Sequence, residues 1–145
     1  MAAVHQTIAC LRFFGDDLDP DHISKSLNAR PTTAYRKGAA IDPEEGDAVL
    51  AQTGTWQLEA DEELSGDLGA QLTALLAELT DDLAVWRDLS AQYDGDVLVG
   101  LFMADGKEGF YLEPALLSAL GERGLVLDFE LYGTEDDDAY HDDDA

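Results

Sequence analysis

Apolar side chains recur three or four residues apart from Leu68 to Leu89, and this repeat constrains the fold more than any other feature of the chain. Residues at that spacing lie on one stripe of a helix, so the repeat predicts a single amphipathic helix from about Gly66 to Gln92. A helix with one apolar stripe must bury that stripe against a second layer of structure. The rest of the chain therefore has to supply the layer that covers it.

Segments with a two-residue apolar repeat predict the strands of that second layer. Strands are expected at residues 4–14, 32–37, 55–59, 96–104, 109–112 and 125–132, shorter helices at 19–28 and from Pro114 to Gly121 or Gly124, and an exposed, mobile loop at 38–54. The first strand is expected to be partly covered on both faces, and the apolar run at 96–104 is typical of a central strand covered on both faces or nearly so. In the last strand the inward residues are expected to be Leu125, Leu127, Phe129 and Leu131.

Strands and helices interleave here without the regular repeat of a doubly wound parallel sheet. The order predicts an α+β fold, a two-layer sandwich in which helices pack on one face of a mixed, mostly antiparallel sheet. The specific expectation is a ferredoxin-like core with an extra α-β unit, and the long helix would lie across one face of the sheet. Residues 1–133 form a single domain in this interpretation, and 134–145 form an acidic disordered tail, because they carry no apolar pattern.

The chain has 32 Asp and Glu against 8 Lys and Arg, for a formal net charge of −24. Such a polyanion repels nucleic acid phosphates and anionic membrane surfaces, and it attracts basic proteins. We therefore expect a basic protein partner and expect neither nucleic acid nor membrane binding. An uncovered edge strand could also pair two copies, so a monomer and a homodimer both remain open.

The cysteine content and the N-terminal sequence indicate the cellular compartment of the protein. The single cysteine, Cys10, excludes an internal disulfide framework. The N-terminus lacks the basic region of a signal peptide, and no apolar run reaches the roughly 20 residues of a membrane span. These features predict a cytoplasmic protein.

Asp17, Asp19 and Asp21 have the spacing of the first ligands in a calcium loop. The pattern fails further on, because His22 stands where the loop needs Gly and Asn28 stands where it needs a bidentate Glu. Capping of a helix that begins at Pro20 explains Asp19 and Asp21 without a metal ion. We therefore predict no metal site.

The sequence also predicts no catalytic residues and no cofactor. Cys10 lies in an apolar strand and is interpreted as an inert buried thiol, because nothing near it in sequence would lower its pKa. His5, His22 and His141 occur in no metal-binding frame. The nucleophile-elbow, phosphate-loop and dinucleotide-binding motifs do not occur.

Scarce positive charge gathers between Lys25 and Lys37, where half of the Lys and Arg residues lie. Arg36 and Lys37 are candidates for contacting an anionic ligand or a carboxylate on a partner, with Tyr35 and Trp56 as aromatic neighbours. Alternatively, both cations pair with local acids and hold the following loop in place. In the tail the candidate contacts to a basic partner are Asp136, Asp137, Asp138, Asp142, Asp143 and Asp144.

Four segments in this order resemble a known family: FFGDDLDPDHIS, ARPTTAYRKG, GTWQLE and GFYLEPALLSALGERGLVLDFELY. Together they resemble the uncharacterised bacterial family named domain of unknown function 4279, over residues 7–133. The resemblance implies a fold and no reaction, cofactor or catalytic residue. The chain departs from the family pattern in its acidity and its Asp-rich end, so a role built on those features need not extend to the family.

The leading hypothesis is a non-enzymatic acidic module that docks on a basic protein, for example an immunity protein that masks the substrate-binding face of a cationic toxin or nuclease. An alternative is that the charge is an adaptation to high salt and has no meaning for partners; the low Lys content is consistent with this. A third is an enzyme of unknown chemistry, which would need a cleft with a perturbed carboxylate or Cys10.

Overall fold

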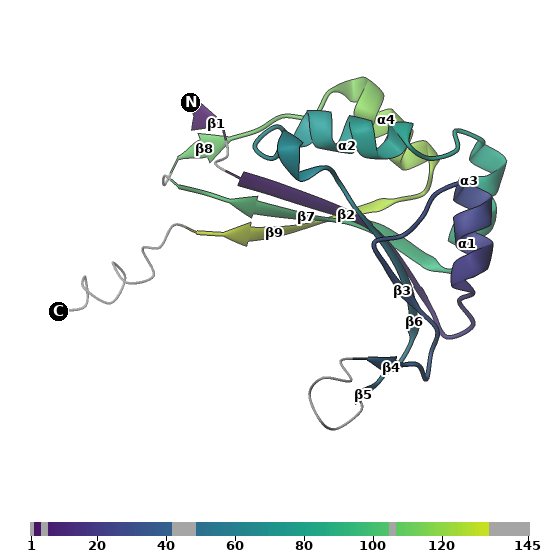
Figure 1. Cartoon of the computed structure of the whole chain (residues 1–145). Coiled ribbons are helices and arrows are strands. Elements are labelled where there is room, and N and C mark those ends of the chain that lie inside the picture. Colours follow the sequence, from purple (N-terminus) through teal and green to yellow (C-terminus); the bar gives the residue numbers. More distant parts are fainter. Residues whose placement is uncertain (1, 4–5, 42–48, 105–106, 134–145) are drawn as a thin grey trace.

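The computed structural model describes residues 2–3, 6–41, 49–104 and 107–133, and the chain forms an open sheet with helices above it (Figure 1). The strands of the main sheet are β2 (Gln6–Gly15), β3 (Thr33–Tyr35), β6 (Gly54–Glu59), β7 (Asp94–Phe102) and β9 (Val126–Tyr132). The helices are α1 (Pro20–Leu27), η2 (Glu62–Leu64, a 3-10 turn), α2 (Leu68–Ala77), α3 (Leu83–Gln92) and α4 (Pro114–Glu122). Two small sheets pair β1 (Ala2–Ala3) with β8 (Glu108–Gly109), and β4 (Ala40–Ile41) with β5 (Val49–Leu50).

The main sheet has the strand order β3-β6-β2-β7-β9. β2 runs antiparallel to both of its neighbours, β3 runs antiparallel to β6, and β9 runs parallel to β7. The first four strands, with the helices between them, make the split β-α-β arrangement of a ferredoxin-like fold. α4 and β9 add one α-β unit at the edge. The predicted α+β sandwich and its extra unit are confirmed.

All the helices cover the same face of the sheet (Figure 1). In β2 the side chains of Thr7, Ala9, Leu11 and Phe13 point to the helices and are buried, whereas Ile8 on the other face is 41% exposed. β7 follows the same alternation, with Val97, Val99 and Leu101 buried. The expectation that β7 is covered on both faces, or nearly so, was wrong, because no described element lies over the second face of the sheet. In β2 the second-face residues Cys10, Arg12 and Phe14 are partly buried, as expected.

Three aromatic residues form the centre of the core between the two layers. The ring of Phe13 lies 6.3 Å from Trp56 and 6.3 Å from Trp86, measured between ring centroids. Each indole N–H has an acceptor: Trp56 donates to Oγ of Ser24 at 3.0 Å, and Trp86 donates to the carbonyl of Thr80 at 2.8 Å. These bonds allow two large amphipathic rings to be fully buried.

The predicted helix over 66–92 is interrupted, and this corrects the main secondary-structure prediction. α2 ends at Ala77 and α3 begins at Leu83, with Asp82 as N-cap, whose carboxylate accepts from the N–H of Ala84 at 3.0 Å. The N–H of Thr80 donates to the carbonyl of Leu27 at the end of α1. The linker is therefore held by tertiary hydrogen bonds in place of the helical ones, and the apolar spacing continues across it into α3.

The two shorter helices agree with the prediction. α1 has Asp19 as N-cap, accepting from the N–H groups of Asp21 and His22, and Asn28 ends the helix in the left-handed region with φ 58°. α4 begins at Pro114 and ends at Glu122, followed by Gly124 with φ 72°. At both C-termini a positive φ allows the chain to leave the helix.

Smaller corrections concern the loops. The predicted loop at 38–54 contains the paired strands β4 and β5, and its residues 42–48 lie outside the described residues. The predicted strand at 109–112 does not join the main sheet; β8 pairs with β1 instead, and 110–113 have no regular structure. The predicted disordered tail at 134–145 also lies outside the described residues. None of the described helices has the length and apolar content that crossing a membrane requires.

β9 is the edge strand of the sheet, and its burial departs from the prediction. Leu125, just before it, is buried and Leu127 is partly buried against the core, as expected of inward residues. Phe129 and Leu131 lie on the same face, but they are 39% and 68% exposed. The alternation was correct, and the extent of burial was not, because the helices do not cover the far end of the edge strand.

Candidate interaction surfaces

One face of the five-stranded sheet is not covered by any described helix (Figure 1). The alternate side chains of five neighbouring strands point to this face, and Arg12 lies at its centre, between Gln57 on β6 and Asp96 on β7. Exposed carboxylates of Glu59, Asp94 and Glu130 share the face. A rigid sheet thus presents mainly negative charge on this side of the molecule.

Arg12 makes the best-formed ion pair in the described residues. Its Nε donates to Oδ1 of Asp96 at 2.8 Å, its Nη2 donates to Oδ2 at 2.7 Å, and Asp128 lies 3.6 Å from the same Nη2. The guanidinium also stacks over the ring of Phe14 at 5.1 Å. The hydrogen bond to Asp96 raises the pKa of Arg12, so the pair holds its charges firmly. Arg12 is occupied by these two carboxylates and offers little to an outside anion.

Cys10 lies beside Arg12 on the same face, half-buried between β6 and β7. Burial raises the pKa of its thiol to about 11, and the charge of Glu59 adds to the effect. The thiol is therefore protonated at neutral pH. A cysteine nucleophile has to be in the thiolate form, so Cys10 is a poor nucleophile at this pH. The raised pKa agrees with the predicted low reactivity of Cys10, whereas its half-buried position on the open face differs from the predicted buried thiol.

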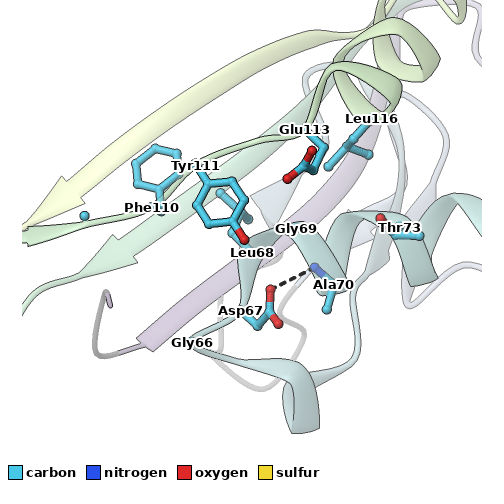
Figure 2. A pocket seen from close by; sticks show the side chains of 11 residues that line it. Gly66, Asp67, Leu68, Gly69, Ala70, Thr73, Phe110, Tyr111, Glu113 and Leu116 are labelled. Carbon is cyan, nitrogen blue, oxygen red and sulfur yellow. Dashed lines mark hydrogen bonds between the residues drawn. The ribbon is translucent and has the colours of Figure 1, made fainter. Parts of the chain in front are cut away.

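A groove on the helical side has a volume of about 620 Å³ and lies between the first turn of α2 and residues 109–116 (Figure 2). Tyr111 and Phe110 border it and are 77% and 44% exposed. Two carboxylates line the same hollow. Asp67 caps α2 through the N–H of Ala70 at 3.1 Å, whereas Glu113, at the N-cap position of α4, makes no side-chain capping bond.

The chemistry of this groove suits a cation with an apolar stem. Exposed aromatic faces attract ammonium and guanidinium groups, and carboxylates beside them add direct charge attraction. The floor is apolar, with Leu68 and Leu116 among its lining residues, and can contact the methylene groups of a Lys or Arg side chain. An anion would meet two negative charges here, even though the groove lies at a helix N-terminus.

The predicted contact residues around Arg36 do not form one surface. Arg36 pairs with Asp19 at 2.8 Å and Lys37 pairs with Asp16 at 3.4 Å, all four side chains being exposed. The alternative in which both cations pair with local acids is thus confirmed. Tyr35 is half-buried on β3.

Trp56 requires a correction, because it is 0% exposed and packs against Phe13 in the core. It cannot contact a partner in the folded protein. The six aspartates predicted to bind a partner from the tail, Asp136, Asp137, Asp138, Asp142, Asp143 and Asp144, lie outside the described residues.

The acidic run at the start of α1 acts locally. Asp19 caps the helix and also holds Arg36, so the capping interpretation is confirmed. Among the described residues no three His, Cys, Asp or Glu side chains are arranged to hold a metal ion.

Sequence reasoning did not identify the groove residues. Phe110 and Tyr111 lie in the segment 109–112, which the pattern predicts as a strand, Glu113 follows directly after it, and Asp67 lies at the start of a leucine-rich helix. The approach of this segment to α2 depends on the tertiary structure.

Comparisons with known proteins identify the family and nothing more specific. No curated protein and no solved structure matches the chain. One family does match, described as "Domain of unknown function (DUF4279)", over residues 5–134. The match spans the whole sheet and every helix described above, and so the chain is a member of the DUF4279 family.

Proposed function

We propose that this protein is a cytoplasmic, non-enzymatic acidic module that docks on a basic protein, and that the groove beside Tyr111 receives a Lys or Arg side chain of that partner. The observation that carries the proposal is the combination, in one hollow, of two exposed aromatic rings with the carboxylates of Asp67 and Glu113. Aromatic anchors beside charge are the residues that most often dominate the affinity of protein interfaces.

The distribution of charge supports the same function. Among the described residues Asp16, Asp19, Asp96 and Asp128 form ion pairs, and over the whole sequence 8 Lys and Arg cannot neutralise 32 Asp and Glu. A surface of this kind increases the rate at which a basic protein associates and disfavours acidic partners.

The most specific form of the proposal is an immunity-type inhibitor. A toxin or nuclease that acts on a phosphate-rich substrate carries a basic face, and an acidic protein can cover that face in place of the substrate. Each carboxylate on the rigid sheet would then occupy the position of a phosphate. The proposal extends to this chain alone, because it rests on the charge of this sequence.

A short peptide with one cation tests the groove directly. We expect acetyl-Leu-Arg-Leu-amide to shift the backbone NMR signals of Ala70 and Tyr111 during a titration at 50 mM KCl. The same peptide with citrulline in place of arginine keeps the shape and loses the charge, and it should bind at least about fivefold more weakly. Raising KCl to 500 mM should weaken the arginine peptide further.

Matched variants separate the groove from general acidity. Tyr111→Ala and Glu113→Gln should each weaken the arginine peptide by about fivefold. Asp88→Asn removes one charge from an exposed position on α3 and should leave the affinity unchanged. Equal binding of the arginine and citrulline peptides, or equal losses in Glu113→Gln and Asp88→Asn, would count against the groove as the cation site.

A further inference from the structure

β9 has an unpaired edge that can accept another strand. It is the last strand in the order β3-β6-β2-β7-β9, and no described residue pairs with its outer side. With 7 residues it is also much longer than β3, the 3-residue strand at the opposite edge. A long edge with apolar side chains is a ready template for pairing with another chain.

The register of β9 on β7 shows which backbone groups are free. The carbonyl of Tyr132 accepts from the N–H of Met103, so Tyr132 directs its backbone groups toward β7. Along a strand the N–H and C=O of successive residues point to opposite sides. The N–H and C=O groups of Leu127, Phe129 and Leu131 therefore point to the open edge, where no described strand pairs with them.

The side chains of β9 define what the added strand must look like. On the helical face Phe129 and Leu131 are exposed, and Phe110 from the groove lies 5.8 Å from Phe129 between ring centroids. On the other face Asp128 and Glu130 are exposed carboxylates; Asp128 lies 3.6 Å from Nη2 of Arg12, and Glu130 accepts from the hydroxyl of Tyr132, so each has exposed oxygen left for a further cation. Side chains of paired strands lie opposite one another on the same face, about 5 Å apart. A matching strand would alternate apolar residues with Lys or Arg.

A second copy of this chain fits the edge poorly. If two β9 strands paired antiparallel around Phe129, Asp128 of each copy would lie opposite Glu130 of the other. Like charges directly opposite one another destabilise a strand pair, and two such pairs would form at once. The net charge of −24 on each chain also disfavours association of two copies.

We infer that a basic partner docks by adding an extended strand to the β9 edge, with its apolar side chains against Phe129 and Leu131 and its Lys or Arg side chains against Asp128 and Glu130. This inference rests on the proposed function, because it takes the partner to be basic. The contact between Phe110 and Phe129 makes the groove and the edge one continuous surface.

Amide hydrogen exchange on the full chain tests the inference. The probe is acetyl-Lys-Val-Lys-Val-Lys-Val-Lys-amide, and its control has the same residues with all lysines first. We expect the alternating peptide to slow exchange at Leu127, Phe129 and Leu131 by about tenfold or more at saturation. The control peptide should not do so. Asp128 and Glu130, whose amides already face β7, provide the internal reference.

Two variants identify the edge as the docking site. Leu131→Pro removes an N–H that faces outward and leaves the bonds to β7 in place, and it should abolish the protection. Leu131→Ala shortens the same side chain, keeps the N–H and should retain binding within about fivefold. If Leu131→Pro fails to fold, Asp128→Asn with Glu130→Gln should weaken the alternating peptide by about tenfold at 50 mM KCl.

The contrary outcomes are distinct. Binding of the peptide without slower exchange at the amides of Leu127, Phe129 and Leu131 would overturn the inference. The proposed function would not be overturned by that result, because the arginine and citrulline peptides test it separately. Protection in the free protein that disappears on dilution would show that a second copy takes the edge. Protection that is insensitive to dilution and lost on truncation after Gly133 would show that the chain covers its own edge, which also overturns the inference.

Discussion

At the scale of the residue, the reactivity of Cys10 depends on neighbours that are distant in sequence. Gln57 on β6 and Leu98 on β7 flank it in the sheet, and Glu59 contributes to the rise in the pKa of its thiol. The sequence identified an apolar strand around Cys10 and predicted an unreactive thiol, with which the raised pKa agrees. It could not predict that the thiol lies on the open face of the sheet next to the ion pair of Arg12.

The pKa of about 11 leads to a prediction about thiol labelling. At pH 8 the thiolate fraction of folded Cys10 should be on the order of a hundredfold below that of a thiol with the ordinary value of 9.0, and iodoacetamide should react correspondingly slowly. The stability that this thiol contributes is fully present below pH 9 and is lost as the pH rises toward 11. Cys10→Ser should lack that loss in urea unfolding. Rapid labelling of the folded protein at pH 8 would contradict the prediction.

The hydrogen-bond partners of a buried polar residue cannot be predicted from its own position in the sequence. Gln71 lies within the leucine repeat of α2, yet it is buried and accepts a hydrogen bond from Thr7, while its amide donates to the carbonyl of Asp61 at 3.0 Å. Its partners lie on β2 and just before η2. A repeat in one segment cannot show which polar residue will find partners from two others.

At the scale of the element, the interruption between α2 and α3 arises from competition between local and tertiary hydrogen bonds. The leucine spacing favours one helix, while Thr80, Asp81 and Asp82 favour a new helix start. Thr80 decides the outcome, because it bonds both to the end of α1 and to the indole of Trp86. The capping signal was visible in the sequence, and the bonds that make use of it were not.

The cap of α3 provides a test at this scale. Asp82→Ala removes the acceptor for the N–H of Ala84 and should lower the free energy of unfolding by about 0.5–2 kcal/mol. Asp81→Ala removes the same charge from the neighbouring exposed position and should cost less than about 0.5 kcal/mol. Urea denaturation followed by tryptophan fluorescence measures both. Equal losses in the two variants would mean that charge, and not capping, stabilises this region.

At the scale of the whole molecule, the charge of −24 opposes folding through self-repulsion, and in the proposed function it also attracts the basic partner. Salt distinguishes the binding function from adaptation to high salt. For a binding module we expect the free energy of unfolding to rise by no more than about 1 kcal/mol between 0.1 and 2 M KCl, as screening relieves the repulsion between surface carboxylates. Urea titrations at several KCl concentrations measure this. A gain of several kcal/mol would favour the high-salt alternative.

The sequence by itself determined the features that depend on neighbours along the chain. The alternation in β9, the caps and boundaries of α1 and α4, and the order of strands and helices can all be read from local spacing, and that order led to the ferredoxin-like core with its extra unit. Acidity as a property of the whole chain is likewise a matter of composition.

Only the tertiary structure decided which side chains of each apolar pattern are buried. The same alternation leaves Val99 buried and its register partner Phe129 exposed, because β7 lies within the sheet and β9 at its edge. Likewise, the aromatic residue Trp56 is buried in the core, while the aromatic residue Tyr111 is exposed and lines a groove together with Asp67. Burial depends on which segments come together in space, and a repeat within one segment carries no information about its distant neighbours.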